Sequence, residues 1–169
     1  MASNGKGNSR EEMQMLTFTL DNILYGVNVS QVREVKNFEG VTPVPYAPAY
    51  VRGVTNMRGE VIPVIDLRKR FGLECSNEKS NIMIIVQDKH PVGIMVDSVM
   101  EVLTLPKNDI EDNNDNLIVD KSEAVLGVAK HDEELIILLD LLRVASKDGM
   151  NMGEDKKGFQ MQTEKQPSP

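Results

Sequence analysis

The stretch GVTNMRGEVIPVIDL, residues 53–67, sets the fold of this chain. It holds most of two apolar segments of equal length, VRGVTNM (51–57) and EVIPVID (60–66), with Arg58 and Gly59 between them. Glycine accepts the positive φ that a two-residue hairpin turn requires, and β-branched residues on both sides favour strands. The stretch therefore predicts a β-hairpin with Arg58 at its tip.

The same stretch occurs a second time in altered form. Shifted by 74 residues, it aligns with GVAKHDEELIILLDL (127–141), with six of fifteen positions identical. Another block, YGVNVSQVREV (25–35), aligns with VGIMVDSVMEV (92–102) at a shift of 67, with five of eleven identical. Chance agreement between β-branched strands is the alternative, but paired Gly, Glu and Asp favour a true internal repeat.

The repeat predicts two related halves. A half of about 65 residues is marginally stable by itself, so we expect the halves to pack together and bury a shared apolar seam, which is a natural groove for a partner. The change of shift from 67 to 74 places seven additional residues of the second half in or near the polar stretch 106–124. Insertions of this kind belong in surface loops.

Further strand-length runs of apolar residues, separated by turn residues, make the chain an all-β protein. Many short strands with small turns predict small barrels or a sandwich. Helical signal is limited to short pieces at 67–72 and 141–145, and Ser30 is a candidate N-cap for a single turn. The further runs are MLTFTL (15–20), YGVNV (25–29), NIMIIVQ (81–87), VGIMVD (92–97), MEVLTL (100–105), VLGVAK (125–130) and ELIILLD (134–140).

Composition divides the chain into a folded part and two tails. Residues 1–12 and 147–169 are rich in Gly, Ser, Asn, Gln, Pro and charged side chains, which predicts a disordered N-terminal tail and a flexible C-terminal tail. The folded part then spans 13–146, with halves of roughly 13–75 and 80–146.

Charge and hydropathy exclude several classes of partner. The net charge is −7, no stripe of Lys and Arg with interleaved aromatics is present, and a negative surface repels phosphate backbones, so we expect no nucleic acid partner. The N-terminus lacks the apolar segment of a signal peptide, and the longest apolar run, LIILL (135–139), is too short to span a bilayer. A single cysteine, Cys75, fits a reducing compartment. We expect a cytoplasmic protein.

The candidates for catalysis are two aspartates and two histidines. Asp66 and Asp140 each end an apolar strand and begin a helical turn, where a carboxylate caps the exposed N–H groups, and this structural role is favoured over an acid/base pair. His90 and His131 lie in predicted turns, far in the sequence from any supported nucleophile. An enzyme that uses these aspartates with a turn histidine is the alternative, but we expect no catalytic residue.

No cofactor or metal is expected either. The glycines show no nucleotide-binding spacing. From Asp112 the spacing of acidic and amide side chains resembles a calcium loop, but its sixth position, which requires glycine, is Leu117. A plain acidic loop is favoured. The five candidate ligands are Asp112, Asn114, Asn116, Asp120 and Glu123.

Three segments together resemble the CheW family of chemotaxis coupling proteins. They are GVTNMRGEVIPVIDLRKRFG (53–72), FTLDNILYGVNVSQVREV (18–35) and ELIILLDLLRV (134–144), and the resemblance covers residues 15–145. It implies two small SH3-like, five-stranded β-barrels packed around a common hydrophobic core, in agreement with the internal repeat.

The resemblance also implies a function and partners. CheW-like proteins are non-catalytic adaptors that join the regulatory domain of the histidine kinase CheA to the cytoplasmic tip of chemoreceptors (methyl-accepting chemotaxis proteins). We therefore expect recruitment to membrane-associated receptor arrays without direct membrane insertion. The alternative is the coupling half of a larger chemotaxis protein with a receiver domain; the 24 residues that follow the last apolar segment argue against it.

Six residues match positions that the family uses for partner binding. Arg58 suits a partner carboxylate or carbonyl through its fork of donors, and the alternative is a solvated turn arginine. The match of Glu34 to Glu101 suggests a role in the fold instead, and the two valines among the six are equally compatible with core packing. The candidate partner-binding residues are Arg58, Asn56, Gly53, Glu34, Val32 and Val35.

One segment departs from the family pattern. The second half often carries Asp-x-Arg before its last apolar strand, whereas here Asp132 is followed by Glu133 and Glu134. The two hairpin tips therefore differ in charge, and we expect partner choice to depend on that difference.

Overall fold

The computed structural model describes residues 11–73, 79–112 and 124–146. Within these ranges the chain forms β-strands with only short helical turns. The elements are β1 (Glu12–Leu20), β2 (Ile23–Asn28), η1 (Val29–Gln31), β3 (Glu34–Asn37), β4 (Val51–Met57), β5 (Glu60–Asp66), α2 (Leu67–Arg70), β6 (Asn81–Gln87), β7 (His90–Val96), β8 (Ser98–Pro106), η2 (Lys107–Asp109), β9 (Ile110–Asp112), β10 (Val125–His131), β11 (Glu134–Leu139) and α3 (Leu141–Ala145).

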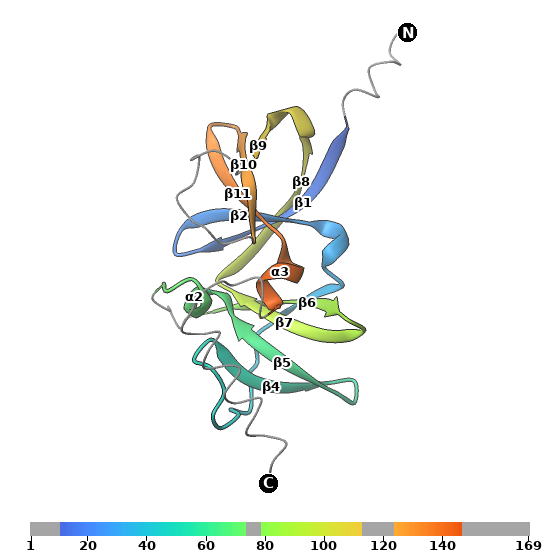
Figure 1. Ribbon diagram of the computed structural model, residues 1–169, viewed down its shortest axis with the longest axis vertical. Helices are drawn as coiled ribbons and strands as arrows, with labels where there is room; N and C mark the ends of the chain where they lie inside the picture. The colour runs from blue at the N-terminus through green and yellow to red at the C-terminus, as the bar shows by residue number, and fades with distance from the viewer. Residues whose placement is uncertain (1–10, 74–78, 113–123, 147–169) are drawn as a thin grey trace.

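The strands form two sheets, and each sheet contains strands of both halves. Sheet A has the order β8-β1-β2-β11-β10-β9, and sheet B has the order β3-β6-β7-β5-β4. The first half thus gives its opening hairpin to sheet A and β3, β4 and β5 to sheet B, while the second half gives its opening hairpin to sheet B and its other strands to sheet A. Figure 1 shows sheet A above sheet B, with α3 at their boundary.

Parallel pairing joins the halves within each sheet. β11 pairs with β2 in parallel, and β5 pairs with β7 in parallel, whereas the other strand pairs are antiparallel. The chain crosses from sheet A to sheet B through η1 and returns at Asp97, between β7 and β8. Since the crossovers occupy equivalent places in the repeat, the exchange of strands is itself symmetric.

The strands are apolar on both faces because each face contributes to a different core. In β6, Met83 and Ile85 pack into a core shared by the two sheets, while Ile82 and Ile84 pack into a smaller core of sheet B. Residues of β11 alternate in the same way between the shared core and a small core of sheet A. Each fully buried aliphatic side chain contributes about 1.5–3 kcal/mol. The predicted shared core is present, but it lies between the two sheets and not between the two sequence halves, because each sheet contains strands of both halves.

Four two-residue turns connect the main hairpins. Both central residues of each turn have positive φ, as type I′ turns require: Asp21 and Asn22, Arg58 and Gly59, Asp88 and Lys89, Asp132 and Glu133. The predicted tip at Arg58 is confirmed. His131 was placed in a turn, but it is the last residue of β10, and His90 is likewise the first residue of β7.

The short helices begin as the sequence predicts, with one correction. The carboxylate of Asp66 accepts a hydrogen bond from the backbone N–H of Arg68, and that of Asp140 accepts one from Leu142, so both aspartates are N-caps. The predicted cap at Ser30 was wrong. Ser30 lies inside η1, and the side chain of Asn28 is the cap, because its oxygen accepts from the Ser30 N–H.

The predicted all-β class and the two packed strand units are confirmed. Two strands were missed. β3 lies at an edge of sheet B with three of its four residues exposed, and β9 has only three residues, so neither shows a period-two apolar pattern. Because of β9, sheet A has six strands where five were expected.

Candidate functional site

Two of the predicted site residues form an ion pair at the β4–β5 tip. The guanidinium of Arg58 donates two hydrogen bonds to the carboxylate of Glu34, with Nη1 to Oε2 at 2.7 Å and Nη2 to Oε1 at 3.0 Å. The side chain of Arg58 is 70% exposed and that of Glu34 is 24% exposed. The hydrogen bond from Arg58 lowers the pKa of Glu34 below its ordinary value, although desolvation of the carboxylate acts in the opposite direction. The pair presents an ordered, charged tip to solvent.

Asn56 and Gly53 shape this tip. The side-chain oxygen of Asn56 accepts a hydrogen bond from the Gly59 N–H at 3.2 Å, which fixes the turn that carries Arg58. Gly53 is buried and has φ 148°, and a Cβ there would lie 2.2 Å from the backbone oxygen of Thr42. Gly53 therefore lies away from the exposed surface, and we expect it to support the hairpin without contacting a partner.

The two candidate valines differ in exposure. Val32 is half-buried and packs against the shared core, in agreement with the core role that the sequence left open. Val35 lies on β3 and is 41% exposed. We therefore define the Arg58 face as Arg58, Glu34, Asn56 and Val35, all contributed by β3 and the β4–β5 hairpin of sheet B.

The equivalent tip of sheet A carries different charges. Asp132, which corresponds to Arg58, is 87% exposed, and its carboxylate lies 3.5 Å from the ring of His131. Glu101, which corresponds to Glu34, is exposed, and its backbone N–H and C=O both bond to the hydroxyl of Thr17. The second tip thus presents an exposed acid at the position that Arg58 occupies in the first.

The sequence did not predict how each crossover contacts the opposite helical turn. Gln31 of η1 donates to the Asp140 carboxylate at 2.9 Å and accepts from the Leu141 N–H at 3.0 Å. On the other side, Asp97 accepts from Arg68 at 2.9 Å, and Arg68 also donates to Asp66. These hydrogen bonds and ion pairs between the crossovers and the helical turns join residues far apart in sequence, and no local sequence pattern predicts them.

Comparison with known proteins agrees with this architecture. A family model described as the CheW-like domain matches residues 14–148. The chain belongs to the CheW family. The resemblance predicted from its sequence is thereby confirmed.

CheW-family relatives match over most of their own length. The chemotaxis protein CheW of Klebsiella aerogenes is 32% identical over 139 residues, which cover 81% of this chain and 84% of the relative. The chemotaxis protein CheW of Bacillus subtilis is 32% identical over 138 residues, covering 80% and 88%. The crystal structure of the scaffolding protein TtCheW from Thermoanaerobacter tengcongensis has a TM-score of 0.74 at 33% identity, covering 84% of this chain and 98% of that one.

The residues considered for catalysis have structural partners in this CheW-family chain. The side chain of Asp66 is fully buried and is held by the guanidinium groups of Arg68 and Arg52. Asp140 caps α3 and is bonded to Gln31. Both carboxylates are thus engaged in the fold, and this arrangement disfavours the enzymatic alternative.

The structure describes only part of the segment considered for metal binding, and it does not describe the single cysteine. The calcium-loop candidate at 112–123 lies, beyond the backbone of Asp112, outside the described residues, as does Cys75. Among the residues that are described, no group of three or more His, Cys, Asp or Glu side chains is arranged to hold a metal ion. No described helix is long and apolar enough to cross a membrane.

Proposed function

We propose that this chain is a non-catalytic adaptor that couples chemoreceptors to the histidine kinase CheA in bacterial chemotaxis. The observation that carries the proposal is the likeness to a scaffolding protein over 98% of that protein's length. The chemotaxis names of the relatives support the same role. The adaptor works in the cytoplasm and joins receptor arrays through its partners.

The Arg58 face is proposed as a binding surface for one of these partners. Its arginine is presented on a rigid hairpin and oriented by Glu34, so little side-chain freedom is lost when a partner binds. A planar guanidinium forms bidentate hydrogen bonds with carboxylates and carbonyls. Val35, the residue after Glu34 on β3, is also exposed. Arginine is enriched among the residues that contribute most to binding energy at protein interfaces.

The two sheets allow two separate binding surfaces. Sheet B carries the Arg58 face, and sheet A carries the acidic tip around Asp132. Because the kinase domain and the receptor tip are different molecules, an adaptor with unlike tips binds each of them without competition at a single surface. The CheA regulatory domain and the receptor hairpin tip are the proposed partners.

Affinity measurements with both partners test the proposal. Titration calorimetry with a CheA regulatory-domain fragment and with a receptor-tip fragment is expected to show binding to the full chain. Arg58→Glu is expected to weaken binding of one partner at least tenfold, because it reverses the charge at the centre of the face. The matched control is Lys130→Glu, the same charge change on the other hairpin, which is expected to leave that affinity within threefold. Failure of both partners to bind would overturn the function.

A further inference from the structure

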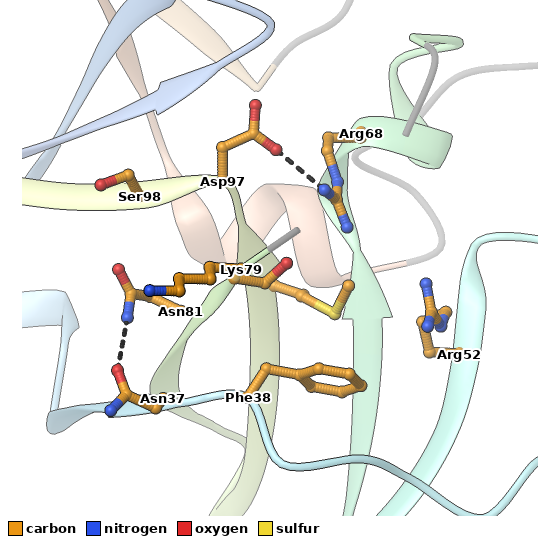
Figure 2. A pocket seen from close by; sticks show the side chains of 10 residues that line it. Asn37, Phe38, Arg52, Arg68, Lys79, Asn81, Asp97 and Ser98 are labelled. Atoms are coloured by element: carbon orange, nitrogen blue, oxygen red, sulfur yellow. Dashed lines mark hydrogen bonds and ion pairs between the residues drawn. The ribbon is translucent and has the colours of Figure 1, made fainter. Parts of the chain in front are cut away.

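A polar pocket opens at the boundary between the two sheets. Its volume is about 600 Å³, within the range of small-molecule sites. It lies between the end of β3, the start of β6, α2 and the crossover at Asp97 and Ser98. Figure 2 shows these side chains around one hollow, with Phe38 beneath it.

The pocket concentrates positive charge in a protein of net charge −7. Arg52, Arg68 and Lys79 line it together with Asp97. The buried Asp66 carboxylate pairs with Arg52 at 3.3 Å and with Arg68 at 3.0 Å, so Lys79 is the lining cation without an ion pair among the described residues. Both carboxylate oxygens of Asp97 already accept hydrogen bonds, one from Arg68 at 2.9 Å and the other from the Asp21 N–H at 2.7 Å. This acid is therefore compensated within the fold and does not repel an incoming anion strongly.

Two of the cations are accessible to a ligand. The side chain of Arg52 is 32% exposed; one guanidinium nitrogen pairs with Asp66 at 3.3 Å, and the group lies 5.4 Å from the centre of the Phe38 ring. Lys79 is exposed, and no carboxylate among the described residues pairs with its ammonium. Figure 2 shows Lys79 extending over Asn81, away from Arg52. The two cations thus mark two separated positions for negative charge.

Neutral donors complete the site. The side-chain oxygen of Asn37 accepts a hydrogen bond from Asn81 at 3.0 Å, which orients the Asn37 NH₂ group as a donor. The hydroxyl of Ser98 contacts only the sulfur of Met100, at 3.8 Å, within the part of the chain that is described. Amide and hydroxyl donors next to cations form a setting that stabilises bound oxyanions.

The internal repeat explains why the pocket is open here. Ser98 corresponds to Gln31, whose longer side chain reaches the start of α3 and bonds to Asp140 and to the Leu141 N–H. The serine is too short to reach α2 in the same way. Arg68 takes over the bond to the junction aspartate, and the space that a glutamine occupies in one half is left empty in the other.

We propose that this pocket binds a small phosphate-bearing molecule, held between Lys79 and Arg52. Separated cations favour a ligand with two charged groups over a single phosphate, so pyrophosphate binds more tightly than inorganic phosphate. The compensated Asp97 and Arg68 form the fixed wall of the site. This binding does not depend on the kinase or the receptor, because all its contacts lie within the chain.

The test is a titration of the full chain with pyrophosphate and with inorganic phosphate, followed by backbone NMR at constant ionic strength. Saturable shifts are expected at Asn37, Asn81 and Ser98, with tighter binding of pyrophosphate. Loss of a charge-assisted hydrogen bond in Lys79→Gln or Arg52→Gln is expected to weaken binding about tenfold or more.

A matched control variant tests whether the weakening is specific to the pocket. Lys130→Gln removes an exposed cation far along the chain, on β10, and is expected to leave the affinity unchanged. Lys79 is exposed and makes no described ion pair, so its substitution keeps the fold even if that of Arg52 does not. Shifts that do not saturate, or equal weakening in all three variants, would overturn the proposal.

Discussion

The β4–β5 and β10–β11 tips occupy equivalent places in the repeat but differ in chemistry. At the first, Arg58 and Glu34 form a bidentate ion pair. In the second half, the residues at the equivalent sequence positions, Asp132 and Glu101, are both acids. Both turns have the same positive-φ backbone, so the fold does not require the difference. The comparison teaches that the repeat maintains the backbone of the hairpin, whereas the side chains at its tip differ between the two halves.

The two strand-to-helix junctions differ in the same manner. Asp66 and Asp140 both cap helices, but Asp66 is fully buried and paired with the buried Arg68, whereas Asp140 is 22% exposed and is bonded to Gln31 and to the half-exposed Arg143. We therefore expect these two identical residues to contribute unequally to the free energy of unfolding. Substitutions at matched positions of the two halves measure this inequality.

The largest expected effect is at the junctions. Asp66→Ala is expected to lower the free energy of unfolding by about 3–5 kcal/mol, because it leaves the buried Arg68 without its main partner. Asp140→Ala removes a partly exposed cap and is expected to cost about 1 kcal/mol. Urea unfolding of the two variants gives both values. Equal losses would contradict the asymmetry of the junctions.

The next effect concerns the support of the first tip. Gly53→Ala is expected to destabilise the chain by about 3 kcal/mol, because its Cβ meets the Thr42 backbone at 2.2 Å. Gly59→Ala is the matched control, since its Cβ meets no atom within 4 Å and only the positive φ costs about 1 kcal/mol. Thermal unfolding compares the two, and a larger loss at Gly59 would show that the close approach is unimportant.

The smallest effect is the titration of Glu34. Because its folded pKa is lowered, the stabilisation from the ion pair is present above the ordinary glutamate pKa and is lost as the pH falls through the folded value. Arg58→Gln is expected to raise the pKa of Glu34 toward its ordinary value, whereas Lys130→Gln is not. NMR of the Glu34 carboxyl carbon follows both variants. An unchanged midpoint in Arg58→Gln would mean that the pair is not formed in solution.

Sequence patterns predicted the strands with strong local signals. β4, β5 and β6 begin and end where the apolar runs and turn residues indicated, and the repeat placed the capping aspartates in both halves. β3 and β9 were missed because both are short, lie at sheet edges and bury few side chains. Their pairing depends on strands that are distant in sequence.

The exchange of strands between the sheets was not predictable for the same reason. The parallel pairs β2–β11 and β5–β7 have no connecting turn whose sequence specifies them. The sequence identified Arg58 and Glu34 as candidate site residues, but it did not predict that they contact each other. Their ion pair forms only when β3 approaches the tip of the β4–β5 hairpin. The pocket at Lys79 was missed because its lining comes from six elements and the loops beside them.

One measurement tests the proposed role of the unlike tips most directly. Backbone NMR of the full chain is followed while the CheA regulatory domain and a receptor-tip fragment are added in turn. We predict that amides of 56–59 and of β3 respond to one partner, and that amides of 130–133 do not respond to that partner. No response at 56–59 with either partner, or equal responses of both tips to the same partner, would contradict it.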